Sequence, residues 1–412
     1  MTEVQGEATI LLLLLGGVIM ASIVIRRLFE QIHLPAVVGY TAIGLLIACL
    51  DSSATLISPE ARGIVGIFAQ IGLVTLLFRV GLESNLSALI QQLRPALLIW
   101  VSDVTISALT AFLAVHYLFG FGLVPAILCA AAFSATSVGV STAVWRDAGA
   151  LDRPSGALLI DVAELDDISA VFVISILFAL GPLLETEASR SLAPLLAQQT
   201  VLVLVKLALF IILCILFSRF LERRLTKQFT KLDENHGAAF FAAGTAFIIA
   251  ATADGLGLSL AIGAMFAGLA FSRDPAERKI DESFSPIYDL FAPFFFVHIG
   301  MGISPQDIGG ALGLGLVLFA VAAVGKLVGV GLPSLSFVRP RGALLIGASM
   351  VPRAEIALLV MGYGLSLGPW ATPPALYNAI VLASLATCIV SPIVVRRLLQ
   401  AGPPAKAEGA ES

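Results

Sequence analysis

The chain has 412 residues, of which 58% are hydrophobic and 13% are charged, and its formal net charge is -4. Soluble globular proteins carry roughly 25% charged residues, so this chain has too few polar side chains to cover the surface of soluble domains. The composition predicts an integral membrane protein, and its acidic balance gives no support for nucleic-acid binding.

Apolar segments long enough to cross a membrane follow one another along the whole chain. A transmembrane helix needs about 20 apolar residues, and segments of that length are bounded by charged residues, Pro or Gly. We expect an all-α polytopic membrane protein with one transmembrane unit, residues 1–400, and a disordered tail, 401–412. Its thirteen helices are expected at about 8–29, 34–50, 61–82, 94–118, 122–145, 154–181, 194–220, 236–254, 257–272, 285–303, 308–334, 341–367 and 373–397.

The charges in the loops predict the orientation. With thirteen spans, one side collects eighteen lysines and arginines, whereas the other has only Arg62 and Arg190. Because basic loops stay in the cytoplasm, we expect the N-terminus outside and the C-terminus inside. The first span lacks the basic region of a signal peptide and is expected to remain as a helix of the mature chain. We expect a multi-pass membrane protein.

The odd number of spans also predicts internal symmetry. The first six and the last six helices flank a linker helix, so the two halves have opposite topology. The segment at about 221–236, near the middle of the chain, is predicted to be a charged cytoplasmic connector. An inverted repeat of this kind is typical of secondary transporters.

Ionisable residues within the predicted spans are candidates for function, because each charge costs roughly 2.5–3.5 kcal/mol at a helix centre. The densest group is the sequence DVAELDDISA in the helix at 154–181. Hard oxygen ligands of this kind suit a hard cation or a proton; a structural ion-pair network is the alternative. The candidates are Arg79, Asp103, Asp161, Glu164, Asp166, Asp167, Lys206, Lys326, Arg353 and Glu355.

Asp166 and Asp167 lie near the middle of their helix and point about 100° apart, so one can face a cavity while the other meets a partner. Glu164 shares the face of Asp167, and Asp161 lies further toward the cytoplasm. Lys326, in the middle of an apolar helix, needs a carboxylate partner. The Asp pair is one candidate partner for it and Asp103 is the other.

Two spans carry predicted interruptions. The span at 122–145 contains FSATSVGVSTAV, whose small and hydroxylated residues make a poor helix interior. The span at 341–367 contains Pro352, which removes a backbone donor. These spans occupy corresponding positions in the two halves, and discontinuous helices at matching positions indicate a substrate site near the midplane. Glu355 or Lys326 could neutralise the charges of the half-helix ends.

Other classes of site have no support in the sequence. The chain has no nucleotide-binding fingerprint, and the four cysteines stand singly within apolar runs. We therefore expect neither an enzyme nor an ATP-driven pump, no cofactor and no nucleotide-binding domain in the chain.

The motifs resemble those of the monovalent cation:proton antiporter superfamily, in the branch of bacterial Na+/H+ antiporters with a paired-aspartate motif. Seven motifs occur in the order found in that family, and the resemblance covers nearly the whole chain. They are HLPAVVGYTAIGLLIA, LLFRVGLESNL, FSATSVGVS, ELDDIS, FAPFFFVHIGM, GKLVGVGLP and MVPRAEIAL.

The resemblance implies an antiporter fold with two crossing broken helices. It further implies a homodimer, in which a core from helices 4–6 and 11–13 moves against a dimerisation domain from helices 1–3 and 8–10. Asp167 would bind Na+ or H+ alternately. Asp166 would join the Na+ site and pair with Lys326, and this pair would act as salt bridge and proton carrier. The resemblance also implies a multi-pass protein of the bacterial inner membrane.

The remaining site residues follow from the same resemblance. Thr136 and Ser137 would supply oxygens at the crossover. Glu355, Arg353 and Asp103 would compensate helix dipoles or act in gating.

Glu164 and Asp161 depart from the family pattern and are possible accessory carboxylates. The expected function is secondary active, electrogenic Na+(Li+)/H+ antiport. The alternative is a K+/H+ antiporter or K+ efflux system on the same fold.

Overall fold

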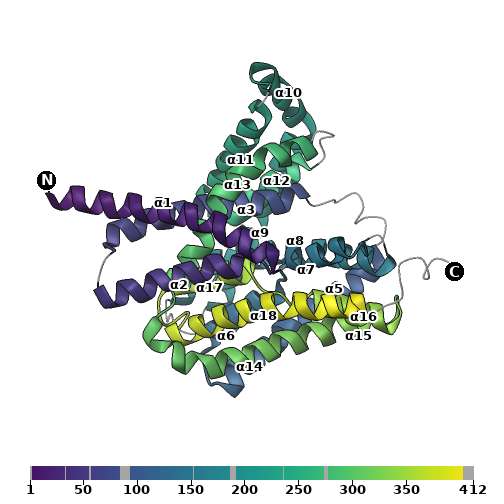
Figure 1. Cartoon of the computed structure of the whole chain (residues 1–412). Coiled ribbons are helices and arrows are strands. Elements are labelled where there is room, and N and C mark those ends of the chain that lie inside the picture. The colour runs from purple at the N-terminus through teal and green to yellow at the C-terminus, as the bar shows by residue number, and fades with distance from the viewer. Residues whose placement is uncertain are drawn as a thin grey trace. The chain divides into compact units, whose positions relative to one another are not determined.

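The computed structural model describes residues 2–32, 34–54, 57–83, 93–151, 153–185, 192–234, 236–272 and 277–401. Every regular element within these ranges is helical (Figure 1), as the composition predicts. The predicted tail at 401–412 lies almost wholly outside the described residues.

Ten of the described helical segments are long and apolar enough to cross a membrane. Two shorter apolar helices, α12 (Leu260–Phe271) and α17 (Glu355–Leu367), are also present. A chain that exposes many large apolar side chains on such helices needs lipid around it. The expected all-α polytopic membrane fold is thus confirmed in its class.

The chain divides into two compact units, which are described separately. Unit 1 comprises residues 1–23, 50–85 and 171–298. Its interior is built by α3 packing on α11 and α12. The ring of Phe78 contacts the ring of Phe271 edge-on and that of Phe284 at a tilt. Its helices are the first part of α1 (Thr2–Gln31), the end of α2 (Ala36–Ala54), α3 (Pro59–Glu83), the second part of α8 (Pro154–Glu185), α9 (Leu192–Leu216), the π-helical turn η2 (Phe217–Glu222), α10 (Arg223–Leu232), α11 (Gly237–Gly255), α12 and most of α13 (Glu277–Met301).

Unit 2 comprises residues 24–49, 86–170 and 299–412. It contains the remaining parts of α1, α2, α8 and α13. Its other elements are α5 (Leu93–Leu113), the π-helical turn η1 (Ala114–Leu118), α6 (Leu123–Ser134), α7 (Val138–Asp147), the 3-10 turn η3 (Pro305–Asp307), α14 (Ile308–Lys326), the π-helical turn η4 (Leu327–Gly331), α15 (Leu332–Ser334), α16 (Pro340–Ser349), α17 and α18 (Pro374–Gln400).

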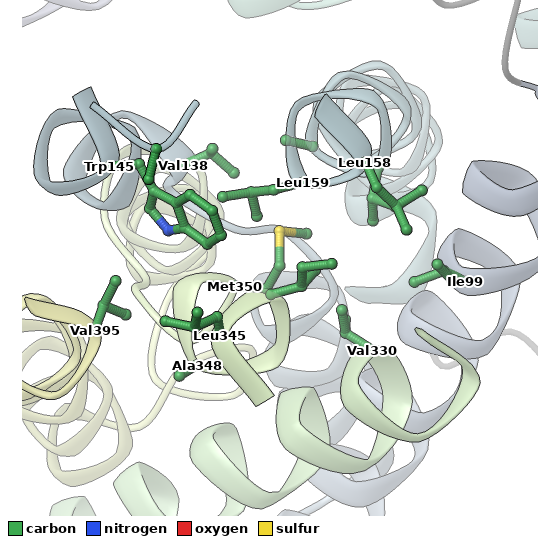
Figure 2. Close-up of a cluster of buried hydrophobic side chains, with 14 of the residues drawn as sticks. Ile99, Val138, Trp145, Leu158, Leu159, Val330, Leu345, Ala348, Met350 and Val395 are labelled. Carbon is green, nitrogen blue, oxygen red and sulfur yellow. The ribbon is translucent and has the colours of Figure 1, made fainter. Parts of the chain in front are cut away.

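A buried apolar cluster organises unit 2 around its short helices. Trp145 of α7, Leu159 of α8, Leu345 of α16 and Val395 of α18 pack together with Met350 (Figure 2). Each of these side chains is almost completely buried. The cluster holds α7 and α16 in place, although neither is long enough to cross a membrane alone.

The turn predicted between the eighth and ninth spans is present. α11 ends at Gly255 and α12 begins at Leu260. Between them, Gly257 has φ of +75°, a left-handed conformation that L side chains rarely adopt. A turn of two glycines in four residues is therefore enough to reverse the chain here.

The helix that carries the seventh predicted span extends beyond about 220, where the apolar span itself is expected to end. The helical backbone continues through η2 and α10 to Leu232, into the segment predicted as a connector. The reason is that hydropathy marks where the apolar part ends, whereas the charged sequence RRLTKQFTKL still favours helix.

Candidate cation site

Two interrupted helices lie in unit 2, where the sequence predicted them. α6 ends at Ser134 and α7 begins at Val138, and Ala135 between them has an extended backbone. α16 ends at Ser349 and α17 begins at Glu355. The second gap contains Pro352, which cannot donate to a helical hydrogen bond. Both predicted interruptions are confirmed.

The two interruptions are hydrogen-bonded to each other. The backbone N–H of Ser137 donates to the carbonyl of Pro352 at 2.9 Å. In the opposite direction, Arg353 Nη1 donates to the carbonyl of Ala135 and lies 3.5 Å from Thr136 Oγ1. Backbone groups that a continuous helix would satisfy internally are thus satisfied across the crossing.

Glu355 occupies the first turn of α17 and reaches the other interruption. Its Oε2 accepts a hydrogen bond from Ser137 Oγ at 2.9 Å. A carboxylate near a helix N-terminus is stabilised by the partial positive charge of the exposed N–H groups. The Ser137 hydroxyl adds a direct bond between the two broken helices.

The C-terminal end of α6 meets two buried cations. Lys326 Nζ donates to the Ser134 carbonyl at 2.9 Å, and Arg353 donates to the next carbonyl, that of Ala135. Both side chains are almost completely excluded from solvent, and the Arg353 guanidinium lies 5.8 Å from the ring centre of Phe133. Cations at this position complement the partial negative charge of the helix end.

Lys326 lies between two carboxylates. Its Nζ is 2.6 Å from Asp103 Oδ2 on α5 and 3.6 Å from Asp166 Oδ2 on α8. All three side chains are buried. A Cβ at Gly329, in the π-helical turn that follows Lys326, would lie only 3.1 Å from Asp103 Cα, so the missing side chain permits the close approach of the two helices.

Asp166 and Asp167 have different surroundings, as their angular separation predicts. Asp166 is fully buried, and neither of its carboxylate oxygens accepts a hydrogen bond from the described part of the chain. Asp167 is only partly buried. One carboxylate of the pair therefore faces Lys326 while its neighbour stays accessible.

Two further carboxylates, Asp161 and Glu164, also lie on α8. Asp161 is buried, and Glu164 is partly buried with its Oε2 oxygen enclosed. Within the described residues, no group of three or more His, Cys, Asp or Glu side chains is arranged to hold a metal ion. The role of Asp161 and Glu164 as accessory ligands stays a prediction.

Sequence reasoning missed three residues that form hydrogen bonds at Asp103 and Asp166. Ser107 Oγ donates to Asp103 Oδ1 at 3.0 Å, and Trp100 Nε1 donates at 2.9 Å to Ser169, whose hydroxyl donates to the Asp166 carbonyl. The i, i+4 spacing of Asp103 and Ser107 was available as a signal. The hydrogen bond from Trp100 to Ser169 joins two helices and had no such signal in the sequence.

A second missed group closes the end of α16. Ser349 has its carbonyl bonded by Ser141 Oγ at 2.6 Å and its hydroxyl bonded by Trp145 Nε1 at 2.8 Å. The preceding carbonyl, of Ala348, accepts from Ser391 Oγ at 2.7 Å. These donors satisfy helix-end carbonyls that would otherwise be unpaired in a membrane.

Comparison with known proteins identifies the family. Residues 15–401 match the transmembrane sodium/hydrogen exchanger family. The chain belongs to that family. The resemblance stated from the motifs is therefore confirmed, and the chain is a multi-span membrane protein.

Individual relatives share most of its length. The chain is 27% identical to the high-affinity Na+/H+ antiporter NhaS3 of a Synechocystis strain, over 97% of this chain and 93% of that protein. It is 26% identical to the Na+/H+-K+ antiporter GerN of Bacillus cereus, over 88% and 89%. Among solved structures, the sodium proton antiporter MjNhaP1 of Methanocaldococcus jannaschii is similar, with a TM-score of 0.75 and 15% identity. The superposition covers 96% of this chain and 99% of that one. This last likeness shows the fold.

Proposed function

We propose that the chain exchanges Na+ or Li+ for H+ across the cell membrane as a secondary active transporter. Membership of the exchanger family makes it a cation/proton antiporter, and its similarity to the Na+/H+ antiporter NhaS3 supports Na+ as the cation. The observation that carries the proposal is the unlike pair on α8: Asp166 is buried against Lys326, whereas Asp167 is partly exposed.

Asp167 is proposed to bind the cation and the proton in turn. A bare carboxylate is costly to move through a membrane, whereas a protonated or cation-bound carboxylate is nearly neutral. Only the loaded forms then change access, so one ion exchanges for the other without ATP or a cofactor. Thr136 and Ser137, which are buried at the crossing, are proposed to supply oxygens to the cation together with Asp166.

The ion pair of Lys326 supports the proposed electrogenic exchange. As the cation engages Asp166, its contact with Lys326 is proposed to break and Lys326 to release its proton. Together with the proton from Asp167, more than one proton then exchanges for each cation, so net charge crosses the membrane. Arg353, Glu355 and Asp103 are proposed to keep the crossing neutral on average, because each lies at a helix end or against an opposite charge.

The architecture proposed for this cycle has thirteen spans in an inverted repeat, with the N-terminus outside and the C-terminus inside. Two copies are proposed to form a homodimer through the first three helices and helices 8–10. The core that carries both interruptions then moves to expose Asp167 to each side alternately.

K+ is the alternative cation. The name of GerN includes K+ beside Na+, and the two chains share 26% identity over most of their lengths. The extra carboxylates Asp161 and Glu164 are a feature of this chain on which the choice between the ions could depend.

Everted membrane vesicles with a pH-sensitive dye test the proposal. Addition of Na+ or Li+ to vesicles with an imposed acid interior is expected to dissipate the proton gradient, whereas K+ does so weakly. Asp167→Asn is expected to abolish the response. The matched control is Asp254→Asn, at an exposed carboxylate of unit 1.

Two outcomes would contradict the proposal. If Asp167→Asn kept its Na+-driven response, the assigned carboxylate would be wrong. If K+ alone dissipated the gradient, the alternative cation would replace Na+. Repeating the assay with the membrane potential clamped then tests electrogenicity, since an electrogenic exchange rate changes when the potential is removed.

A further inference from the structure

A pocket of about 360 Å³ lies at the C-terminal end of α18 in unit 2, away from the crossing. Three segments line it: the end of α18, the end of α7 and Ile32, which follows α1. Its volume is in the range of roughly 300–1,000 Å³ that is usual for small-molecule sites. The proposed transport cycle gives it no role.

The charged residues of this pocket have no ion-pair partners among the described residues. Arg396 and Arg397 of α18 and Asp147 of α7 all line it, and all three are exposed. Two guanidinium groups and one carboxylate thus face the same cavity without being paired to one another. Such a pocket offers sites for both signs of charge.

The arginines are not needed to cap their own helix. Arg341 performs that task, donating to the carbonyls of Leu398 and Ala401 at the end of α18. The guanidinium groups of Arg396 and Arg397 therefore remain available to a ligand. Guanidinium groups bind phosphate oxygens in a planar, often bidentate geometry.

The walls of the pocket are apolar. Ile32, Val144 and Ile393 line it, and the exposed side chains of Leu28 and Val390 continue the apolar surface along α1 and α18, one turn further from the charged end. In a membrane-spanning chain this surface contacts acyl chains. The ligand that fits is therefore an amphiphile, with a charged head at the helix ends and an apolar tail along the helices.

We propose that this pocket binds a glycerophospholipid with a phosphoethanolamine head group. Arg396 and Arg397 bind the phosphate, Asp147 binds the ammonium, and the acyl chains lie on the apolar surface of α1 and α18. A free phosphate would leave the apolar walls unused and has no ammonium for Asp147 to bind. An anionic glycerol head group has no cation for Asp147 to bind.

Native mass spectrometry of the delipidated full-length protein in detergent tests the site. The probes are palmitoyl-oleoyl phosphatidylethanolamine, the corresponding phosphatidylglycerol and inorganic phosphate. The wild type is expected to bind the ethanolamine lipid most tightly, and the double variant Arg396→Gln/Arg397→Gln to bind it about tenfold or more weakly. Arg146→Gln, at an exposed arginine next to the pocket residue Asp147, is the matched control and should bind like the wild type.

Asp147→Asn tests the head-group choice separately. It is expected to remove the preference for ethanolamine, so that the two lipids bind within about twofold of each other. Three results would overturn the proposal: unchanged binding by the double arginine variant, a wild-type preference for the glycerol lipid, or inorganic phosphate binding as tightly as the lipid. Lipid binding that appears only after removal of residues 402–412 would also overturn it, because those residues and not a lipid would then be the occupant of the pocket.

Discussion

Lys326 makes its shortest contact with Asp103, at 2.6 Å, on the helix that precedes the first broken helix. Asp166, the partner implied by the paired-aspartate motif, is 1 Å further away at 3.6 Å. A lysine held by two buried carboxylates keeps one of them when the other turns to a cation. Asp103 therefore still contacts the lysine when Asp166 is released in the proposed cycle.

A comparison of coupling free energies checks this ranking. Double-mutant cycles with Lys326→Met and either Asp103→Asn or Asp166→Asn should give couplings within about 0.5–3 kcal/mol. We expect the Asp103 cycle to give the larger value in thermal unfolding of the purified protein. A larger coupling to Asp166 would reverse the assignment of the main partner.

Removal of the lysine alone should strongly destabilise the fold. Lys326→Gln leaves two buried carboxylates without a cation, and breaking a buried pair in this way costs roughly 3–5 kcal/mol. The midpoint of thermal unfolding in detergent should fall markedly. Lys206→Gln, at a partly exposed lysine of α9, is the control and should shift it little; equal shifts for both variants would argue against the buried network.

Loss of the Ser137 hydroxyl should destabilise the protein more than loss of the Thr142 hydroxyl within α7. Ser137→Ala leaves Glu355 without its bond across the crossing, at an expected cost of about 1–3 kcal/mol, since the carboxylate is charged and partly buried. Thr142→Ala removes a hydroxyl that only bonds back within α7 and should be nearly neutral. Unfolding midpoints and the half-maximal Na+ concentration in vesicles measure both effects.

The indole of Trp145 is expected to act as a hydrogen-bond donor as well as an apolar filler. Trp145→Phe keeps much of the ring in the cluster of Figure 2 but removes the N–H that bonds Ser349. We expect a loss of about 0.5–1.5 kcal/mol or somewhat more. Because Ser349→Ala removes the same bond, the double variant should cost less than the two single variants added together. Strict additivity would show that the bond contributes nothing.

Close backbone packing in unit 1 gives a prediction with an internal control. A Cβ at Gly81 of α3 would collide with the backbone of Met265 and Leu269 in α12, whereas one at Gly63 meets open space. Gly81→Ala should therefore lower the unfolding temperature. Gly63→Ala should leave the unfolding temperature unchanged or raise it slightly, because Ala is more favourable than Gly in a helix by about 1 kcal/mol. A similar response of the two variants would contradict this packing.

The class of the fold could be predicted from the sequence because a membrane imposes strong constraints. Apolar segments mark the spans, and Pro352 marks a helix interruption for a local chemical reason. The angular separation of Asp166 and Asp167 likewise depends only on helix geometry. Such features need no knowledge of how the helices pack.

The partners of the site residues could not be predicted in the same way. The choice of Asp103 by Lys326 depends on how closely α14 and η4 approach α5, which Gly329 permits. The contacts of Trp100 with Ser169 and of Trp145 with Ser349 join helices far apart in the chain. Periodicity along one helix carries no information about such pairs.

The hydrogen bonds between Ser137 and Pro352, and between Arg353 and Ala135, tie the two interruptions into one piece. Moving one interruption without the other would break these hydrogen bonds. The distance between two probes, one attached to each broken helix, should therefore stay constant whichever side of the membrane the site faces in the proposed cycle. Distances from these probes to residues of unit 1, measured in the two access states of the proposed cycle, would then give the size of the transport movement.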